Sequence, residues 1–242
     1  GYRVFPEWDR VIHGVKWFEI PKSWTRYVAV DPGRQVCAAL FAAVPPPEEE
    51  VAVYFYDELY IRNCNAEIFG QQMARKCAHD TIQAFIIDHQ EGRKAETGSG
   101  MTIEYQYTAA LQRHKVRSEQ TNHGFLWGSD DVSGGIEAMR AWLISDAEKP
   151  KLRVLTERVP NFDWEVRHYK WKRDPGTRLP IDKPEDRGRV HLMWCFRAFA
   201  MHRVPYIRPA KGKAPKSAVV RALQAKRKRQ KQLVGAEGSV HL

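Results

Sequence analysis

An acidic residue at the end of an apolar segment constrains the fold of this chain more than any other feature. The stretch YVAVDPGRQVCAALFAAV covers residues 27–44 and places Asp31 between two apolar runs. Taking even a milder polar group out of water without a partner costs roughly 2–7 kcal/mol, so a carboxylate in this position requires a partner. The residues alone leave three candidates open, namely a metal ion, an arginine, or a cap at the turn that follows the strand.

The order of apolar segments predicts an α/β protein with a mixed sheet. Two short connections separate strand-like runs over 27–31, 36–44 and 51–61, which favours an antiparallel meander. Apolar residues then recur at spacings of three and four, typical of a helix, before a fourth strand, AFIID, ends at Asp88. This helix is predicted over about 65–76. The later predicted segments are a helix after residue 102, a weak strand at Val116, a helix over about 131–145 capped by Ser129 or Asp130, a short strand over 152–156, a partly helical aromatic segment over 161–171, a basic loop with three prolines, and a helix over roughly 189–203.

The first and fourth predicted strands both end in an aspartate. If these strands are neighbours, Asp31 and Asp88 lie together at one edge of the sheet. Two carboxylates so close repel each other, and a divalent cation that binds both removes the penalty. Taken singly, Asp31 could cap a turn and Asp88 could be an ordinary strand end. The pair favours a metal as the partner of Asp31.

Composition bounds the architecture. A chain of 242 residues with 43% hydrophobic residues can bury one substantial core. We find no apolar run of membrane-spanning length and no signal-peptide pattern, which predicts a soluble protein without a membrane partner. No CxxC pair occurs, so buried free thiols are expected in place of a zinc site. The four cysteines are Cys37, Cys64, Cys77 and Cys195.

The positive charge is concentrated at the C-terminal end. Residues 208–242 hold ten Lys or Arg residues against the single acid Glu237, and therefore carry +9 of the net charge of +10. Three parts are predicted: an extended lead-in over 1–25 that packs on a domain, the domain itself over 26–207, and a basic tail over 208–242. The tail is either a solvated segment or a contact for DNA phosphates. The candidate DNA-binding residues are Lys226, Arg227, Lys228, Arg229 and Lys231.

A strand ending in Asp, a hairpin, a helix and a second strand ending in Asp follow one another, and this order resembles the ribonuclease H-like arrangement. In detail it resembles the C-terminal nuclease domain of the large terminase subunit of tailed double-stranded DNA bacteriophages. The resemblance runs from about residue 2 to 206. It rests on the lead-in before Arg26, on YFYDELYI with Glu58, on FIIDHQEGR, on SDDVSGGIEAMRAWL and on the aromatic segment 164–171. It implies a mixed central sheet of three antiparallel strands followed by parallel strands, flanked by helices.

The last predicted helix departs from the pattern of that family. The family usually closes with His-x-x-Asp, followed by an Arg and an aromatic residue. In HLMWCFRAF, His191 and Arg197 keep their places, but Trp194 stands where the third acid is expected. Asp186, in the loop before this helix, is the candidate substitute. The alternative is that the site lacks a third acid and is weak or inactive.

The resemblance implies a metal-dependent endonuclease that cuts concatemeric viral double-stranded DNA during genome packaging. Asp31, Asp88 and Asp186 would be the catalytic carboxylates. Together with His191 they would hold two Mg²⁺ or Mn²⁺ ions, and Glu58 would support them without touching the ions. Two other functions stay open: another ribonuclease H-like nuclease such as a resolvase or transposase, or a catalytically silent DNA-binding or portal-binding module.

The packaging motor itself is not encoded in this sequence. No GxxxxGK[ST] phosphate-binding motif occurs in the 242 residues. By resemblance, an ATPase domain is expected to precede residue 1 in the full-length protein. The implied partners are double-stranded DNA, that ATPase domain, the portal and the small terminase subunit, and the implied location is the host cytoplasm.

Overall fold

Residues 1–207 of the computed structural model form one compact unit. The structure describes residues 2–33, 35–78, 80–95, 100–120, 124–144, 150–185 and 188–209. Asp186 and the five candidate DNA-binding residues of the tail lie outside these ranges, so their roles stay predictions, as do the domain boundaries. Within the described ranges, no helix has the length and apolar character needed to span a membrane.

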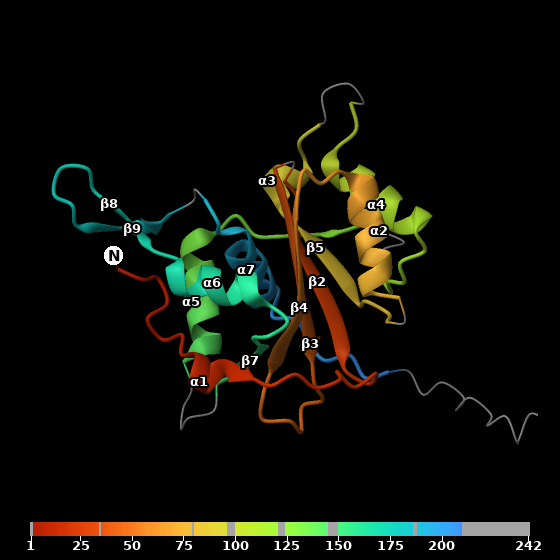
Figure 1. Cartoon of the computed structure of the whole chain (residues 1–242), viewed down its shortest axis with the longest axis horizontal. Coiled ribbons are helices and arrows are strands. Elements are labelled where there is room, and N and C mark those ends of the chain that lie inside the picture. The colour runs from red at the N-terminus through yellow and green to blue at the C-terminus, as the bar shows by residue number, and fades with distance from the viewer. Residues whose placement is uncertain are drawn as a thin grey trace, which may run out of the picture. The chain divides into compact units, whose positions relative to one another are not determined.

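A mixed sheet of seven strands forms the centre of this unit (Figure 1). The strand order is β1-β7-β4-β3-β2-β5-β6; β3 runs antiparallel to β2 and β4, and the other neighbours are parallel. The predicted mixed sheet, with three antiparallel strands continued by parallel ones, is thereby confirmed. The strands are β1 (Gly14–Val15), β2 (Thr25–Asp31), β3 (Val36–Val44), β4 (Val53–Arg62), β5 (Ala84–Ile87), β6 (Leu126–Trp127) and β7 (Leu152–Leu155).

Helices cover both faces of the sheet (Figure 1). On one face α5, α6 and α7 pack on the sheet, and on the other face α2 and α4 do so. A sheet covered on both faces needs near-continuous apolar strands, and the runs before and after Asp31 have this character. The helices are α1 (Arg10–His13), α2 (Ala66–Lys76), α3 (His89–Gly92), α4 (Ile103–Arg113), α5 (Val132–Leu143), α6 (Pro160–His168) and α7 (His191–His202).

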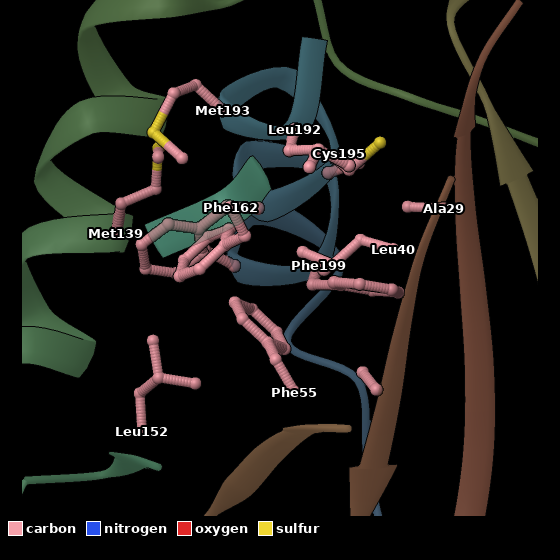
Figure 2. Packing of buried hydrophobic residues seen from close by; sticks show 14 of the residues in the cluster. Ala29, Leu40, Phe55, Met139, Leu152, Phe162, Leu192, Met193, Cys195 and Phe199 are labelled. Carbon is pink, nitrogen blue, oxygen red and sulfur yellow. The ribbon is translucent and has the colours of Figure 1, made fainter. Parts of the chain in front are cut away.

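Small residues on the central strands let α7 approach the sheet closely. Ala29 of β2 and Ala38 and Ala42 of β3 are fully buried on the face that α7 covers. Their short side chains leave room for the aromatic rings of α7 and its neighbours (Figure 2). Phe55 and Phe199 pack there with ring centroids 5.6 Å apart. α7 therefore packs closely on β2 and β3.

The lead-in contributes to the core. Val4, Phe5 and Trp8 are buried in the same cluster as α7, with 4% or less of each residue exposed. β1 pairs in parallel with β7 at the edge of the sheet. The first fifteen residues thus supply both a strand and apolar side chains to the compact unit.

Several predicted elements were wrong in detail. The weak strand at Val116 is not a strand; only an isolated bridge joins Ser118 to Ile82. The predicted basic loop is a β-hairpin formed by β8 (Trp171–Arg173) and β9 (Pro180–Pro184), whose proline-rich composition had favoured a loop. The cap of α5 is Asp131, whose side chain accepts a hydrogen bond from Gly134 N. The predicted free thiols are confirmed, since all four cysteines are free and buried.

Candidate active site at the end of the central strands

The two aspartates predicted to form a pair lie on neighbouring strands. β2 and β5 are parallel, and Val30 pairs with Ile87. Asp31 and Asp88 each follow directly in the chain, and Asp88 N donates a hydrogen bond of 3.2 Å to Val30 O. Neighbouring strands are about 4.8 Å apart, so the backbones of the two aspartates are adjacent at the same sheet edge.

Asp88 is a buried carboxylate that begins a short helix. Its Oδ1 accepts a hydrogen bond of 2.6 Å from Glu91 N, and it thereby caps α3. Burial raises the pKa of Asp88 above its usual value, and the negative charge of Asp31 adds to the increase, while the Glu91 N–H opposes it. A cation bound beside Asp88 would offset both the burial and the repulsion from Asp31, and would thereby favour the charged carboxylate.

Asp31 has a partner within the protein, the imidazole of His191. His191 is the first residue of α7, and its Nδ1 lies 2.7 Å from Asp31 Oδ2. The hydrogen bond to Asp31 raises the pKa of His191, while burial opposes it. The structure thus places His191 against Asp31, and the backbone of Asp31 beside that of Asp88. The carboxylate of Asp31 therefore has a partner within the protein itself, in addition to any metal.

A buried carboxylate that we did not predict caps the helix of His191. The residue before α7 is Val190, which offers no side-chain cap. Glu165 of α6 supplies the missing cap, because Glu165 Oε2 accepts hydrogen bonds of 2.7 and 3.2 Å from Leu192 N and Met193 N. Burial raises the pKa of Glu165 to about 7. The sequence signal for such a residue is a helix that starts without its own Ser, Thr, Asp or Asn.

Glu58 caps the N-terminus of α6 in the same way. α6 also begins without a side-chain cap of its own. Glu58 Oε1 accepts a hydrogen bond of 2.9 Å from Asn161 N, and its Oε2 accepts one of 2.9 Å from Phe162 N. Glu58 therefore supports α6, Glu165 of α6 supports α7, and α7 presents His191 to Asp31. The predicted supporting role of Glu58 stays a proposal, and this chain of contacts is its physical basis.

Trp194 occupies the space beside the end of β5. A Cβ atom on Gly128 would overlap Cζ2 of Trp194, so only glycine leaves room for the indole there. Gly128 N in turn donates a hydrogen bond of 2.8 Å to Ile87 O, on the residue that precedes Asp88. The aromatic ring therefore lies close to the sheet edge that carries Asp31 and Asp88, called the acidic edge below. The family pattern would place a carboxylate at this position.

A groove of about 670 Å³ adjoins these residues. Asp31, His191, Trp194 and Arg197 line it, together with residues of α5 and of the β8–β9 hairpin. Such a volume is typical of a ligand site. The start of α7 is thus accessible to a substrate.

The donor set suits a divalent cation in its chemistry, because carboxylate oxygens are the ligands that Mg²⁺ and Mn²⁺ prefer. Within the described ranges, no three His, Cys, Asp or Glu side chains are arranged to hold a metal ion. Asp186, the predicted third carboxylate, lies outside those ranges. The described residues therefore place Asp31 and Asp88 at the strand ends, Glu91 and Asp130 near Asp88, and His191 against Asp31.

Comparisons with known proteins identify the fold. No family model matches the chain. A cysteine-rich receptor-like protein kinase 25 of Arabidopsis thaliana is 34% identical over 76 residues, which cover 31% of this chain and 11% of the kinase. Such a short local match shows neither a family nor a fold.

Solved structures match most of the compact unit. The large terminase of a thermophilic bacteriophage, in complex with ATP-gamma-S, matches with a TM-score of 0.61 at 15% identity, over 82% of this chain and 44% of that chain. The large terminase nuclease domain of P22 matches with a TM-score of 0.59 at 17% identity, over 85% of this chain and 94% of that domain. The chain thus spans under half the length of the thermophilic phage terminase. The fold of this chain is therefore similar to that of the large terminase nuclease domain of P22, as its sequence predicted.

Proposed function

We propose that this chain is a metal-dependent endonuclease domain that cuts double-stranded viral DNA during genome packaging. The observation that carries the proposal is the adjacency of Asp31 and Asp88 at the ends of parallel strands β2 and β5. The fold shared with the P22 large terminase nuclease domain supports it. Phosphate oxygens of the DNA backbone are the groups such a site would address, so little sequence preference is expected from these residues.

Two Mg²⁺ or Mn²⁺ ions bound at the acidic edge would activate water and stabilise the charge of phosphodiester hydrolysis. Asp31 and Asp88 would hold them, and Asp186 and His191 would complete the ligand set. The residues of the chain prepare this edge: His191 restrains Asp31 through its 2.7 Å contact, and Glu91 N restrains Asp88 through its 2.6 Å hydrogen bond.

The partners proposed for the chain follow from the same likeness. The chain covers 44% of the large terminase of the thermophilic bacteriophage. We propose that in its full-length protein an ATPase domain precedes it, and that it works with double-stranded DNA, the portal and the small terminase subunit in the host cytoplasm.

A specific observation favours one competing function, that of a catalytically silent DNA-binding or portal-binding module. Trp194 fills space beside the acidic edge, and among the described residues no three His, Cys, Asp or Glu side chains are arranged to hold a metal ion. A resolvase or transposase relative is disfavoured, because the lead-in that resembles terminases is built into the core.

Plasmid nicking separates these functions. The wild-type chain is expected to nick a supercoiled plasmid with Mn²⁺ and to lose this activity in EDTA. Asp31→Asn and Asp88→Asn should each abolish nicking, since each removes a charged ligand. Asn keeps the shape at both positions and preserves the cap of α3. Glu48→Gln changes an exposed acid beyond the end of β3 that is opposite to Asp31; it is the matched control and should nick like wild type.

The outcomes are distinct. Full activity in a purified, folded Asp31→Asn or Asp88→Asn chain would disprove the site. Absence of nicking in the wild type, with DNA binding retained, would favour the silent module.

A further inference from the structure

One arginine that lines the groove has no partner among the described residues. Arg197 lies on α7, six residues after His191, and its side chain lines the groove together with Asp31 and Trp194. Its Nε atom is buried without a hydrogen-bond partner. A buried N–H donor without an acceptor is costly, and an anion that reaches the half-buried guanidinium would offset this cost.

The stem of Arg197 is fixed by close packing against α5. A Cβ atom on Gly135 would overlap both Cγ and Cδ of Arg197, so the glycine provides the space in which the side chain lies. The stem and Nε are thereby enclosed, and the end of the guanidinium is the part left to form the groove wall. The arginine is preorganised for a ligand in the groove.

Most of the other charged residues that line the groove are acidic, and they would repel an anionic ligand. Among the described lining residues, the acids are Asp31, Glu91, Glu137, Asp182 and Glu185, and the bases other than Arg197 are Lys183 and His191. A phosphodiester backbone enters such a groove only where cations offset the carboxylates. Arg197 is a fixed cation there, and guanidinium matches the geometry of phosphate oxygens. The indoles of Trp171 and Trp194 also line the groove and strengthen such a contact by excluding water.

We propose that Arg197 binds the phosphodiester backbone of DNA in this groove and holds the strand beside Asp31. The inference rests on the proposed function and deepens it, because it names the side chain that contacts the backbone of the substrate.

The test measures DNA binding without cleavage. The full chain binds a fluorescent DNA duplex with Ca²⁺ in place of Mn²⁺, and a gel verifies that the duplex stays intact. Affinity is measured by anisotropy over a series of salt concentrations. Arg197→Met keeps the apolar stem against Gly135 and removes the charge. Its log–log salt slope should be shallower than that of wild type by about 0.9, the contribution of one phosphate contact.

Two further variants make the result specific. Arg197→Lys restores the positive charge and should regain most of the slope. Arg75→Met removes an equal charge from an exposed position on α2, across the sheet from α7, and should bind with the wild-type slope. The inference is overturned if Arg197→Met keeps the wild-type slope, or if Arg75→Met changes it equally. Such a failure leaves plasmid nicking by the wild type unaffected, so it is distinguishable from a failure of the proposed function.

Discussion

At the scale of single residues, the site depends on how each carboxylate is compensated. Asp31 is paired with His191, whereas Asp88 depends on the backbone N–H of Glu91 and is destabilised by burial. Trp194 adds bulk beside this edge and supplies no ligand. The identity of residue 194 therefore decides how many donors the described part of the site has.

Replacing this tryptophan by a carboxylate is expected to strengthen metal binding. Positions 191 and 194 lie on one face of α7, so an acid at 194 can share an ion with the groups around His191. Trp194→Asp should bind Mn²⁺ more tightly, as measured by electron paramagnetic resonance, and should nick faster. Trp194→Ala is the control, since it removes the indole without adding a ligand.

A different result is expected for Trp194→Asp if Asp186 is the third metal ligand. If Asp186 is already the third ligand, Trp194→Asp changes little, and Asp186→Ala raises the barrier to nicking by about 2–4 kcal/mol, the scale of one lost electrostatic stabiliser. If Trp194→Asp gains nothing and Asp186→Ala loses nothing, both versions of the third ligand are wrong.

At the scale of elements, two helices begin on carboxylates that belong to other elements. Glu58 of β4 caps α6, and Glu165 of α6 caps α7. A helix N-terminus leaves N–H groups without partners and carries partial positive charge, so a buried carboxylate is well placed there. This arrangement links the position of His191 to β4 through two successive caps.

The raised pKa of Glu165 predicts a specific pH dependence of stability. An acid whose pKa rises on folding from about 4.5 to about 7 favours the folded state most when it is protonated. Its contribution therefore becomes less favourable as the pH rises through this interval. Gln at position 165 cannot ionise and keeps an oxygen for the cap. The melting temperature of Glu165→Gln minus that of wild type should therefore increase as the pH rises from 4.5 to 7.

The control for this prediction removes the cap altogether. Glu165→Ala should be destabilised at every pH, by about 1–3 kcal/mol, because two buried N–H groups lose their acceptor. Thermal melts of the three proteins across this pH range test both expectations. A constant difference between Glu165→Gln and wild type would show that Glu165 does not titrate there.

At the scale of the whole molecule, charge and core are separated along the chain. Residues 1–207 form the compact unit and carry a net charge of +1, whereas the tail carries +9. Nonspecific affinity for DNA follows the number of phosphates that Lys and Arg residues neutralise. The tail is therefore expected to dominate nonspecific binding, and the groove to direct cleavage.

Truncation after Ile207 tests this division. The shortened chain should bind DNA more weakly, and its log–log salt slope should be shallower by about 0.9 for each lost phosphate contact. Plasmid nicking should persist at high enzyme concentration, because the acidic edge is intact. An unchanged salt slope would mean that the tail serves another purpose, such as docking to a protein.

The apolar pattern of the sequence predicted the mixed sheet and most of the helices, and it predicted that Asp31 and Asp88 would lie at one edge if their strands were neighbours. Strand ends and helical periodicity are local properties, and parallel neighbours bring their carboxyl ends to one edge. The partners of these residues depended on the tertiary structure. Glu165 meets α7, His191 meets Asp31 and Trp194 meets Gly128 across long stretches of chain, and no local pattern encodes such contacts. The sequence by itself determined that Asp31 and Asp88 each end a buried strand, because this pattern is local. The pairing of β2 with β5 and the packing of α7 on the sheet, which join distant segments, decided that the two carboxylates are neighbours and which side chains surround them.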